Sequence, residues 1–137
     1  MRKKIFYSCL FLMAVLWTGC KKNNSPDARD IFIATYSVTE SWTENGQVLT
    51  KPAYTMTIQK STQQIDKLLF SNFANYGAGV TAEATVNGLS IIIPQQTLSN
   101  SKSIIGTGSL ADPTLTFTYT ENFNSISLVI SAIAQKK

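Results

Sequence analysis

The chain has 137 residues, with 12 lysines and arginines, 8 aspartates and glutamates, two cysteines and no histidine. A chain of this length suits one domain. Without histidine the usual pairing of a nucleophile with a base cannot be assembled, and no cluster of metal-ligand residues is present, so we expect no enzymatic activity, no cofactor and no metal.

The first residues have the layout of an export signal. Arg2 to Lys4 are basic, and the apolar run from Ile5 to Trp17 has 13 residues (17 − 5 + 1). A bilayer-spanning helix needs about 20 residues. A basic segment, a short apolar run and then small residues are instead typical of a secretory signal. We therefore expect residues 1–19 to be removed as a signal peptide.

The residues at the end of this signal suggest a lipid anchor. Thr18-Gly19-Cys20 resembles the lipobox of bacterial lipoproteins, although Trp17 takes the usual leucine position. In that family the cysteine is acylated and becomes the mature N-terminus, so the resemblance implies lipidation at Cys20 and a membrane as partner. An anchor of two or three acyl chains exceeds the single chain that binds only reversibly.

The residue after the cysteine bears on which membrane would hold the protein. Residue 21 is Lys, and not the aspartate that retains many such lipoproteins in the inner membrane. We expect attachment to the outer membrane, on its periplasmic face, with the cell surface as the alternative.

Removal of the signal would leave a nearly neutral chain. Residues 20–137 number 118 (137 − 20 + 1), and loss of Arg2 to Lys4 lowers the formal charge from +4 to +1 (9 − 8). Much of the remaining basic charge lies at the two ends, so a nucleic-acid partner is not expected. We assign residues 20–25 to a tether and 26–137 to the domain. Ser25-Pro26 predicts a short helix over 26–31.

The rest of the chain alternates apolar and polar residues with period two, which indicates half-buried strands. Asn-Gly pairs at 45–46 and 87–88 are strong signals for tight hairpin turns. The pattern predicts eight strands, over 32–43, 48–60, 65–73, 79–87, 89–96, 102–109, 114–121 and 126–134.

Eight sequential antiparallel strands predict an all-β fold. We favour an eight-stranded up-and-down barrel with a short N-terminal helix, since closure leaves no exposed sheet edge. A β-sandwich is the alternative. A membrane-spanning barrel is disfavoured because the lipobox already supplies an anchor and the final residues, Ala132 to Lys137, include no aromatic residue.

The layout also resembles the lipocalin and calycin-like barrels. They begin with a short helix and a first strand that carries a Gly-x-Trp motif, for which this chain has Ala34-Thr35-Tyr36. The resemblance implies a barrel with one open mouth, and a small apolar or amphipathic ligand inside it.

Polar inward positions converge on the mouth of the predicted barrel. Strand direction and parity place five candidate ligand-binding residues there: Glu40, Trp42, Gln95, Lys102 and Glu121. A few polar groups in an apolar pocket would orient a ligand. The simpler interpretation is that these charges reach water and that Lys102 neutralises a glutamate, because such rim ion pairs are common.

The interior itself can be interpreted in two ways. The remaining candidate ligand-binding residues are Tyr36, Tyr54, Ala84, Gly108 and Tyr119. Ala84 and Gly108 would leave space for one small ligand. The glycine could instead serve strand coiling, and the large aromatic residues could fill the gap.

Two functional hypotheses follow. The first is a non-catalytic, lipid-anchored envelope protein whose barrel binds a small hydrophobic ligand. The second is a closed barrel that docks onto another envelope protein or a glycan. The sequence does not determine the oligomeric state.

Overall fold

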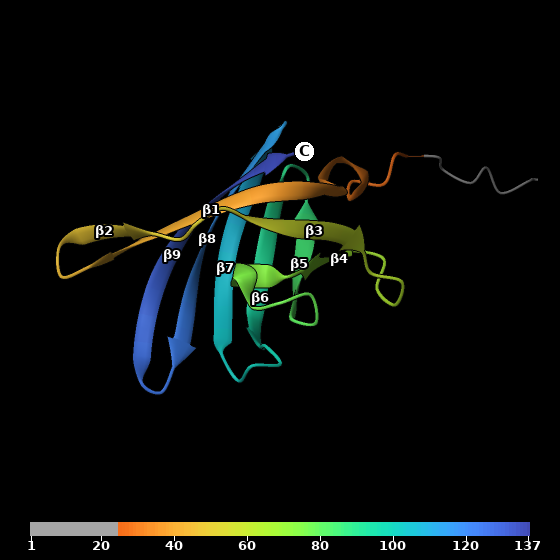
Figure 1. Ribbon diagram of the computed structural model, residues 1–137. Coiled ribbons are helices and arrows are strands. Elements are labelled where there is room, and N and C mark those ends of the chain that lie inside the picture. Colours follow the sequence, from red (N-terminus) through yellow and green to blue (C-terminus); the bar gives the residue numbers. More distant parts are fainter. Residues whose placement is uncertain (1–24) are drawn as a thin grey trace, which may run out of the picture.

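The computed structural model describes residues 25–137, and nearly all of its regular structure is β-strand (Figure 1). The strands are β1 (Ala34–Glu44), β2 (Gln47–Thr50), β3 (Tyr54–Lys60), β4 (Lys67–Ser71), β5 (Thr81–Asn87), β6 (Ser90–Thr97), β7 (Ser103–Ala111), β8 (Thr114–Phe123) and β9 (Ile126–Lys136). None of the helices in this range is long and apolar enough to cross a bilayer. The predicted signal peptide, the acylated Cys20 and nearly all of the tether lie outside the described residues.

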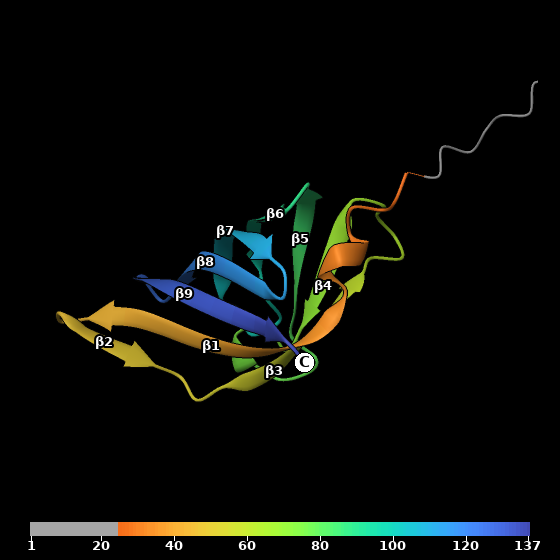
Figure 2. The same ribbon diagram turned by 90° about the horizontal axis from the view of Figure 1, so that it is seen from above.

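The sheet closes into a barrel. From β3 onward each strand pairs antiparallel with the next, and β9 returns to pair with β1. Since β1 also pairs with β3, the ring contains eight strands, and Figure 2 looks into it with β4 and β5 on one side and β8 and β9 on the other. The predicted eight-stranded up-and-down barrel is therefore confirmed, and the sandwich alternative is wrong.

The predicted strand over 48–60 is interrupted, and its first part leaves the ring. Lys51 to Ala53 separate β2 from β3, and Pro52 has no N–H to donate to a sheet ladder. β3 pairs with the first half of β1, from Ala34 to Val38, whereas β2 pairs with the far end, from Ser41 to Glu44. The β1–β2 hairpin therefore projects beyond the barrel (Figure 1).

The short N-terminal helix is a single 3₁₀ turn, η1 (Asp30–Phe32), and it starts later than predicted. The backbone N–H groups of Asp30 and Phe32 donate to the carbonyls three residues earlier, at 2.8 and 3.0 Å. The turn ends where Phe32 becomes fully buried against the core, so packing of this ring fixes the N-terminal segment onto the barrel.

The two ends of the barrel differ in their connections. We call one end the base: it carries the 61–66 loop, the turns at 87–89 and 112–113, and both ends of the described chain. We call the other end the mouth: it carries the 72–80 and 98–102 loops and the turn at 124–125. This is the arrangement expected from an alternating chain direction.

The interior is filled by side chains from every strand of the ring. Four aromatic rings pack at its centre, with centroids 4.9 Å apart for Phe73 and Tyr119 and 6.0–6.3 Å apart for Phe73 with Phe117 and Phe70. A Cβ atom at Gly108 would lie only 2.5 Å from Phe117 Cβ and 2.7 Å from the Thr116 carbonyl oxygen. Glycine is therefore needed at this position for close approach of β7 and β8.

A β-bulge in β6 overturns one predicted inward position. Ile93 pairs with Gly106 but Gln96 pairs with Ile104, so β6 has one extra residue between these pairs. The extra residue reverses the alternation, and Gln95 is exposed. Its neighbour Gln96 uses its side-chain amide to bond the backbone N–H and C=O of Glu83, both at 2.8 Å, and so bridges β6 to β5.

Candidate functional site

A buried carboxylate stands at the centre of the mouth. Glu40 has no exposed surface, because strand alternation aims it inward with Tyr36 and Val38. Its Oε2 accepts a hydrogen bond from Lys51 Nζ at 2.9 Å. Its Oε1 accepts from the hydroxyls of Tyr54, at 2.6 Å, and Tyr119, at 3.0 Å. A buried charge is tolerated only when it is paired and hydrogen-bonded, and Glu40 is both.

A second ion pair lies beside the first. Lys102 Nζ is 2.7 Å from Glu121 Oε1 and donates to the Tyr76 hydroxyl at 2.6 Å. The same hydroxyl donates to Glu121 Oε2. The three residues form a closed triangle in which each polar group has a partner.

The Tyr76 ring joins the two pairs. Lys51 Nζ lies 5.2 Å and Lys102 Nζ 4.2 Å from its centroid, within the range of a cation–π contact. Two lysines and two glutamates cancel in charge. We call this set, with Tyr54, Tyr76 and Tyr119, the mouth network. Each carboxylate and each lysine in this network has a hydrogen-bond partner within it.

The loop between β4 and β5 closes the mouth. Its η2 turn (Phe73–Asn75) inserts Phe73, fully buried, into the aromatic core. The Ala74 carbonyl accepts from Lys51 Nζ at 3.1 Å. Ala74 has φ +55° and Asn72 and Asn75 have φ +60°, a region costly for alanine. The loop therefore holds a strained shape that its buried ring and its polar contacts maintain.

The structure brings together part of the predicted site. Glu40, Lys102 and Glu121 meet in the mouth network, and Tyr54 and Tyr119 join them. Tyr36 lies toward the base, where its hydroxyl donates to the Phe32 carbonyl at 2.9 Å. Trp42 is half-buried near the rim, and no hydrogen bond among the described residues links it to the network.

Three of the predicted lining residues are closely packed by their neighbours. Tyr36 and Ala84 have no exposed surface and Tyr119 has 1%, although a void that holds even one water molecule would leave some surface accessible. Gly108 faces Phe117 and Ile91 at short range rather than open space. The interpretation in which large side chains fill the gap is the one that fits these positions.

Three important residues were not among the predicted site residues. Lys51 has the parity of an outward residue in an unbroken strand, and only the interruption at Pro52 turns it toward Glu40. Phe73 and Tyr76 lie in a connection whose path no periodicity describes. The sequence does carry one signal, because a proline inside a predicted strand indicates a break.

Burial of the tyrosines gives a testable pH dependence. Burial, and then the field of Asp112, raises the pKa of Tyr36 to about 12, and burial, followed by the hydrogen bond to Glu121, raises that of Tyr76 to about 12. Burial, and then the charge of Glu40, raises the pKa of Tyr54 and Tyr119 further.

At a pH between the unfolded and the folded pKa, a tyrosine keeps its proton in the folded protein and loses it on unfolding. Rising pH therefore favours the unfolded state in this range. We expect the free energy of unfolding to be retained below pH 10, the ordinary tyrosine value, and to fall between pH 10 and about 12. Urea unfolding at several pH values, with tyrosinate absorbance alongside, measures this. Tyrosinate formation near pH 10 in the folded protein would contradict it.

Two hollows lie on the outer surface. The first, the wall hollow, lies over β6 to β9 and is lined by Ser90, Ile91, Ile92, Thr107, Gly108, Ser109, Thr116, Phe117, Thr118, Ser131, Ala132 and Ile133. The second, the rim hollow, lies beside the β1–β2 hairpin and is lined by Ser41, Trp42, Thr43, Val48, Ser127, Leu128, Val129 and Ser131. They share Ser131, and neither lining includes a charged residue.

The described residues offer little for a metal. Within residues 25–137 no group of three or more histidine, cysteine, aspartate or glutamate side chains could hold a metal ion. Glu40 and Glu121 are each engaged by a lysine.

Comparison with known proteins supports the fold. Neither a protein-family model nor a curated protein sequence matches the chain. The fold is similar to the crystal structure of a protein of Bacteroides fragilis NCTC 9343 described as a "putative outer membrane protein", with a TM-score of 0.52 and 17% identity over 81% of this chain. The match covers 53% of that protein, so this chain spans about half its length.

Proposed function

We propose that this protein is a non-catalytic, lipid-anchored envelope protein whose closed barrel binds another protein through its outer surface. The observation that carries the proposal is the β1–β2 hairpin, which projects from the barrel with an uncharged, exposed strand beside an uncharged hollow. The burial of the interior supports the same choice, since Tyr36, Ala84 and Tyr119 have at most 1% of their surface accessible. The proposal therefore favours an interaction module over a ligand carrier.

Strand β2 offers a free sheet edge. It pairs with β1 on one side, stands at the end of the strand order, and exposes all its residues. Natural edge strands are commonly protected by charges or proline, because an unpaired edge is a template for another strand. Gln47 to Thr50 have neither. An extended segment of a partner could add to this edge through main-chain hydrogen bonds.

The rim hollow supplies side-chain contacts next to that edge. Val48 is 72% exposed, and Trp42 and Leu128 are half-buried at the same place. Tryptophan in a partly closed apolar site is a frequent energetic centre of protein interfaces. Apolar side chains of a partner strand would find complementary contacts there, whereas a strongly charged partner would not.

The first test is site-specific photo-crosslinking in intact cells. A photoreactive amino acid at Val48 should give a discrete protein adduct, and one at the exposed Thr81 on β5 should not. With the photoreactive amino acid at Val129, on the other side of the rim hollow, Val48→Lys should abolish the adduct, because a charged edge resists strand addition. Thr81→Lys should leave the adduct from Val129 intact. Adducts of equal yield at Val48 and Thr81 would contradict the proposal. A protease-resistant, carbohydrate-containing adduct at Val48 would favour the glycan partner.

The anchor is the second part of the proposal. The lipobox-like end of residues 1–20 supports the anchor. Lys21, and the description of the Bacteroides protein as a "putative outer membrane protein", support attachment to the outer membrane, and we place the domain on its periplasmic face. Cys20→Ser should abolish labelling by a fatty-acid probe and leave precursor or a soluble form. A mutant that is processed and stays in the membrane fraction would refute lipidation. Protease digestion of intact cells would reveal surface exposure instead.

A carrier function remains as a second candidate because of one observation. Phe73 enters the barrel from a loop with three residues of positive φ outside glycine, so movement of this loop would open the interior at the mouth. The carrier would need that movement, and the Phe73→Ala variant tests whether it occurs.

A further inference from the structure

We infer that the base of the barrel rests on the bilayer, with the loop tips at Ile65 and Leu89 inserted among the lipid headgroups. The inference builds on the proposed anchor and adds a second membrane contact, made by the folded domain. Three features carry it: where the chain leaves the barrel, which side chains surround that point, and how their charges are paired.

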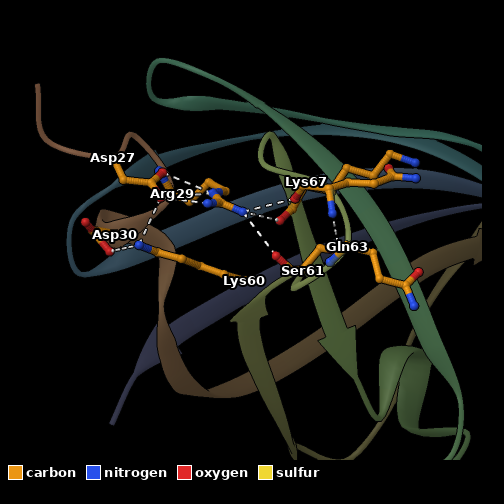
Figure 3. A network of polar contacts seen from close by, with 8 residues as sticks. Asp27, Arg29, Asp30, Lys60, Ser61, Gln63 and Lys67 are labelled. Atoms are coloured by element: carbon orange, nitrogen blue, oxygen red, sulfur yellow. Dashed lines mark hydrogen bonds and ion pairs between the residues drawn. The ribbon is translucent and has the colours of Figure 1, made fainter. Parts of the chain in front are cut away.

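An arginine clamp fixes the point of exit at the base (Figure 3). Arg29 Nη1 donates to the carbonyls of Gln64, at 3.1 Å, and of Ser61 and Lys67, both at 3.4 Å. The other side of its guanidinium holds Asp27. The N-terminal segment is thereby tied to the 61–66 loop, and the chain that leads to Cys20 departs beside it.

The tether is short. From Cys20 to Ser25 the chain has five links, so it reaches at most about 17 Å. An acylated Cys20 would therefore keep the base close to the lipid surface. At such a distance the effective concentration of membrane at the base is high, and a weak contact suffices for docking.

Four exposed apolar side chains lie at the base among the polar and charged ones: Ile31, Ile33, Ile65 and Leu89. Ile65 is 89% exposed and Leu89 is 61% exposed, and they come from the 61–66 loop and the β5–β6 turn. Ile31 and Ile33, on the N-terminal segment itself, are about two-fifths exposed. Binding at the interface of a bilayer grows with the apolar area that is buried there, and these side chains offer such area at one end of the barrel. Exposed apolar residues also occur at the mouth, but the tether does not leave from there.

The charges at the base do not oppose this contact. Lys60 bonds Asp27 at 2.9 Å and Asp30 at 2.5 Å, and Lys136 pairs with Asp112. Apart from the Lys67–Glu83 pair on the wall, the side chains at the base comprise four carboxylates and four cations, a side-chain net of zero (4 − 4): Asp27, Asp30, Asp66, Asp112, Arg29, Lys60, Lys136 and Lys137. Docking should therefore be apolar in origin and should persist in high salt.

Docking of the base would set the orientation of the molecule. The mouth and the β1–β2 hairpin lie at the other end of the barrel, so they would point away from the membrane. The surface proposed to bind a partner would thus be presented to the periplasm rather than buried against lipid.

The test uses an artificial anchor, so that it does not depend on acylation. Residues 21–137 contain all nine strands and the whole described core. A histidine tag in place of Cys20 attaches this chain to phosphatidylcholine vesicles that contain a nickel-chelating lipid. The chain then has no cysteine. Single variants Ile65→Cys, Leu89→Cys and, at the mouth, Asn124→Cys carry an environment-sensitive fluorophore.

We expect the labels at 65 and 89 to shift to shorter wavelength on the vesicles and to lose most of their emission to a quencher carried by the lipid, in low and high salt alike. The label at 124 should remain as in water. Ile65→Ser should weaken the response at 89. Water-like emission at 65 and 89 on vesicle-bound protein would overturn the inference. Absence of fatty-acid labelling in the wild-type protein, or a processed Cys20→Ser variant that stays in the membrane fraction, would overturn only the anchor.

Discussion

Replacement of Glu40 by alanine is expected to lower the free energy of unfolding by about 3–5 kcal/mol, the range for breaking a buried ion pair by removing one partner. Glu40 accepts hydrogen bonds from Lys51, Tyr54 and Tyr119. Lys51 is partly exposed and can turn to water, so most of the loss should come from the two tyrosine hydroxyls, each left buried without an acceptor.

Two controls separate this network from general effects at the mouth. Glu44→Ala, at the exposed end of the same strand, should change stability by no more than about 0.5 kcal/mol. Glu40→Gln keeps an acceptor for the tyrosines but loses the charge, so its loss should be intermediate. Urea denaturation of the three variants measures these differences. If Glu40→Ala were as stable as Glu44→Ala, the mouth network would contribute nothing to the fold.

Phe73→Ala is expected to cost about 3–5 kcal/mol, as for other large-to-small substitutions at fully buried aromatic positions. The ring packs 4.9 Å from Tyr119 and 6.0 Å from Phe117, centroid to centroid. Its removal would leave a cavity in the middle of the core and would also release the strained loop from its main apolar contact. Phe123→Ala, at an exposed rim position, is the matched control and should cost much less.

The same variant distinguishes a solid barrel from a gated one. In the solid barrel the wild type binds no hydrophobic fluorescent probe, and Phe73→Ala binds one only in the cavity that the substitution creates. In a gated carrier the wild type itself takes up the probe, and the variant takes it up faster because the loop no longer closes. Saturable probe uptake by wild-type protein would therefore contradict the solid barrel.

The barrel could be predicted because its strands carry a strict alternation. Tyr36, Glu40, Phe117, Tyr119 and Glu121 all point inward as their parity requires. Chain reversal at each short turn then placed Glu40, Lys102 and Glu121 at one end, where they meet. Local periodicity and direction were sufficient for this part of the site.

The errors arise where the chain departs from the strand repeat. One extra residue in β6 turns Gln95 outward, because a side-chain period of two makes every insertion a reversal of face. Lys51 moves inward for the related reason that Pro52 interrupts its strand. Phe117 and Ile91 occupy the space in front of Gly108. Phe73 adds a ring to the core from a loop, and a loop that folds back into its own barrel leaves no periodic signal.

The proposal that the protein acts through its outer surface is tested most directly by native mass spectrometry of the protein extracted from its own envelope. We predict the mass of the acylated polypeptide alone or in complex with a protein partner, with no small molecule that is released on unfolding. A bound small molecule at one copy per chain, lost from the unfolded protein and absent from a Phe73→Trp variant that keeps the mouth filled, would contradict the account and establish a carrier.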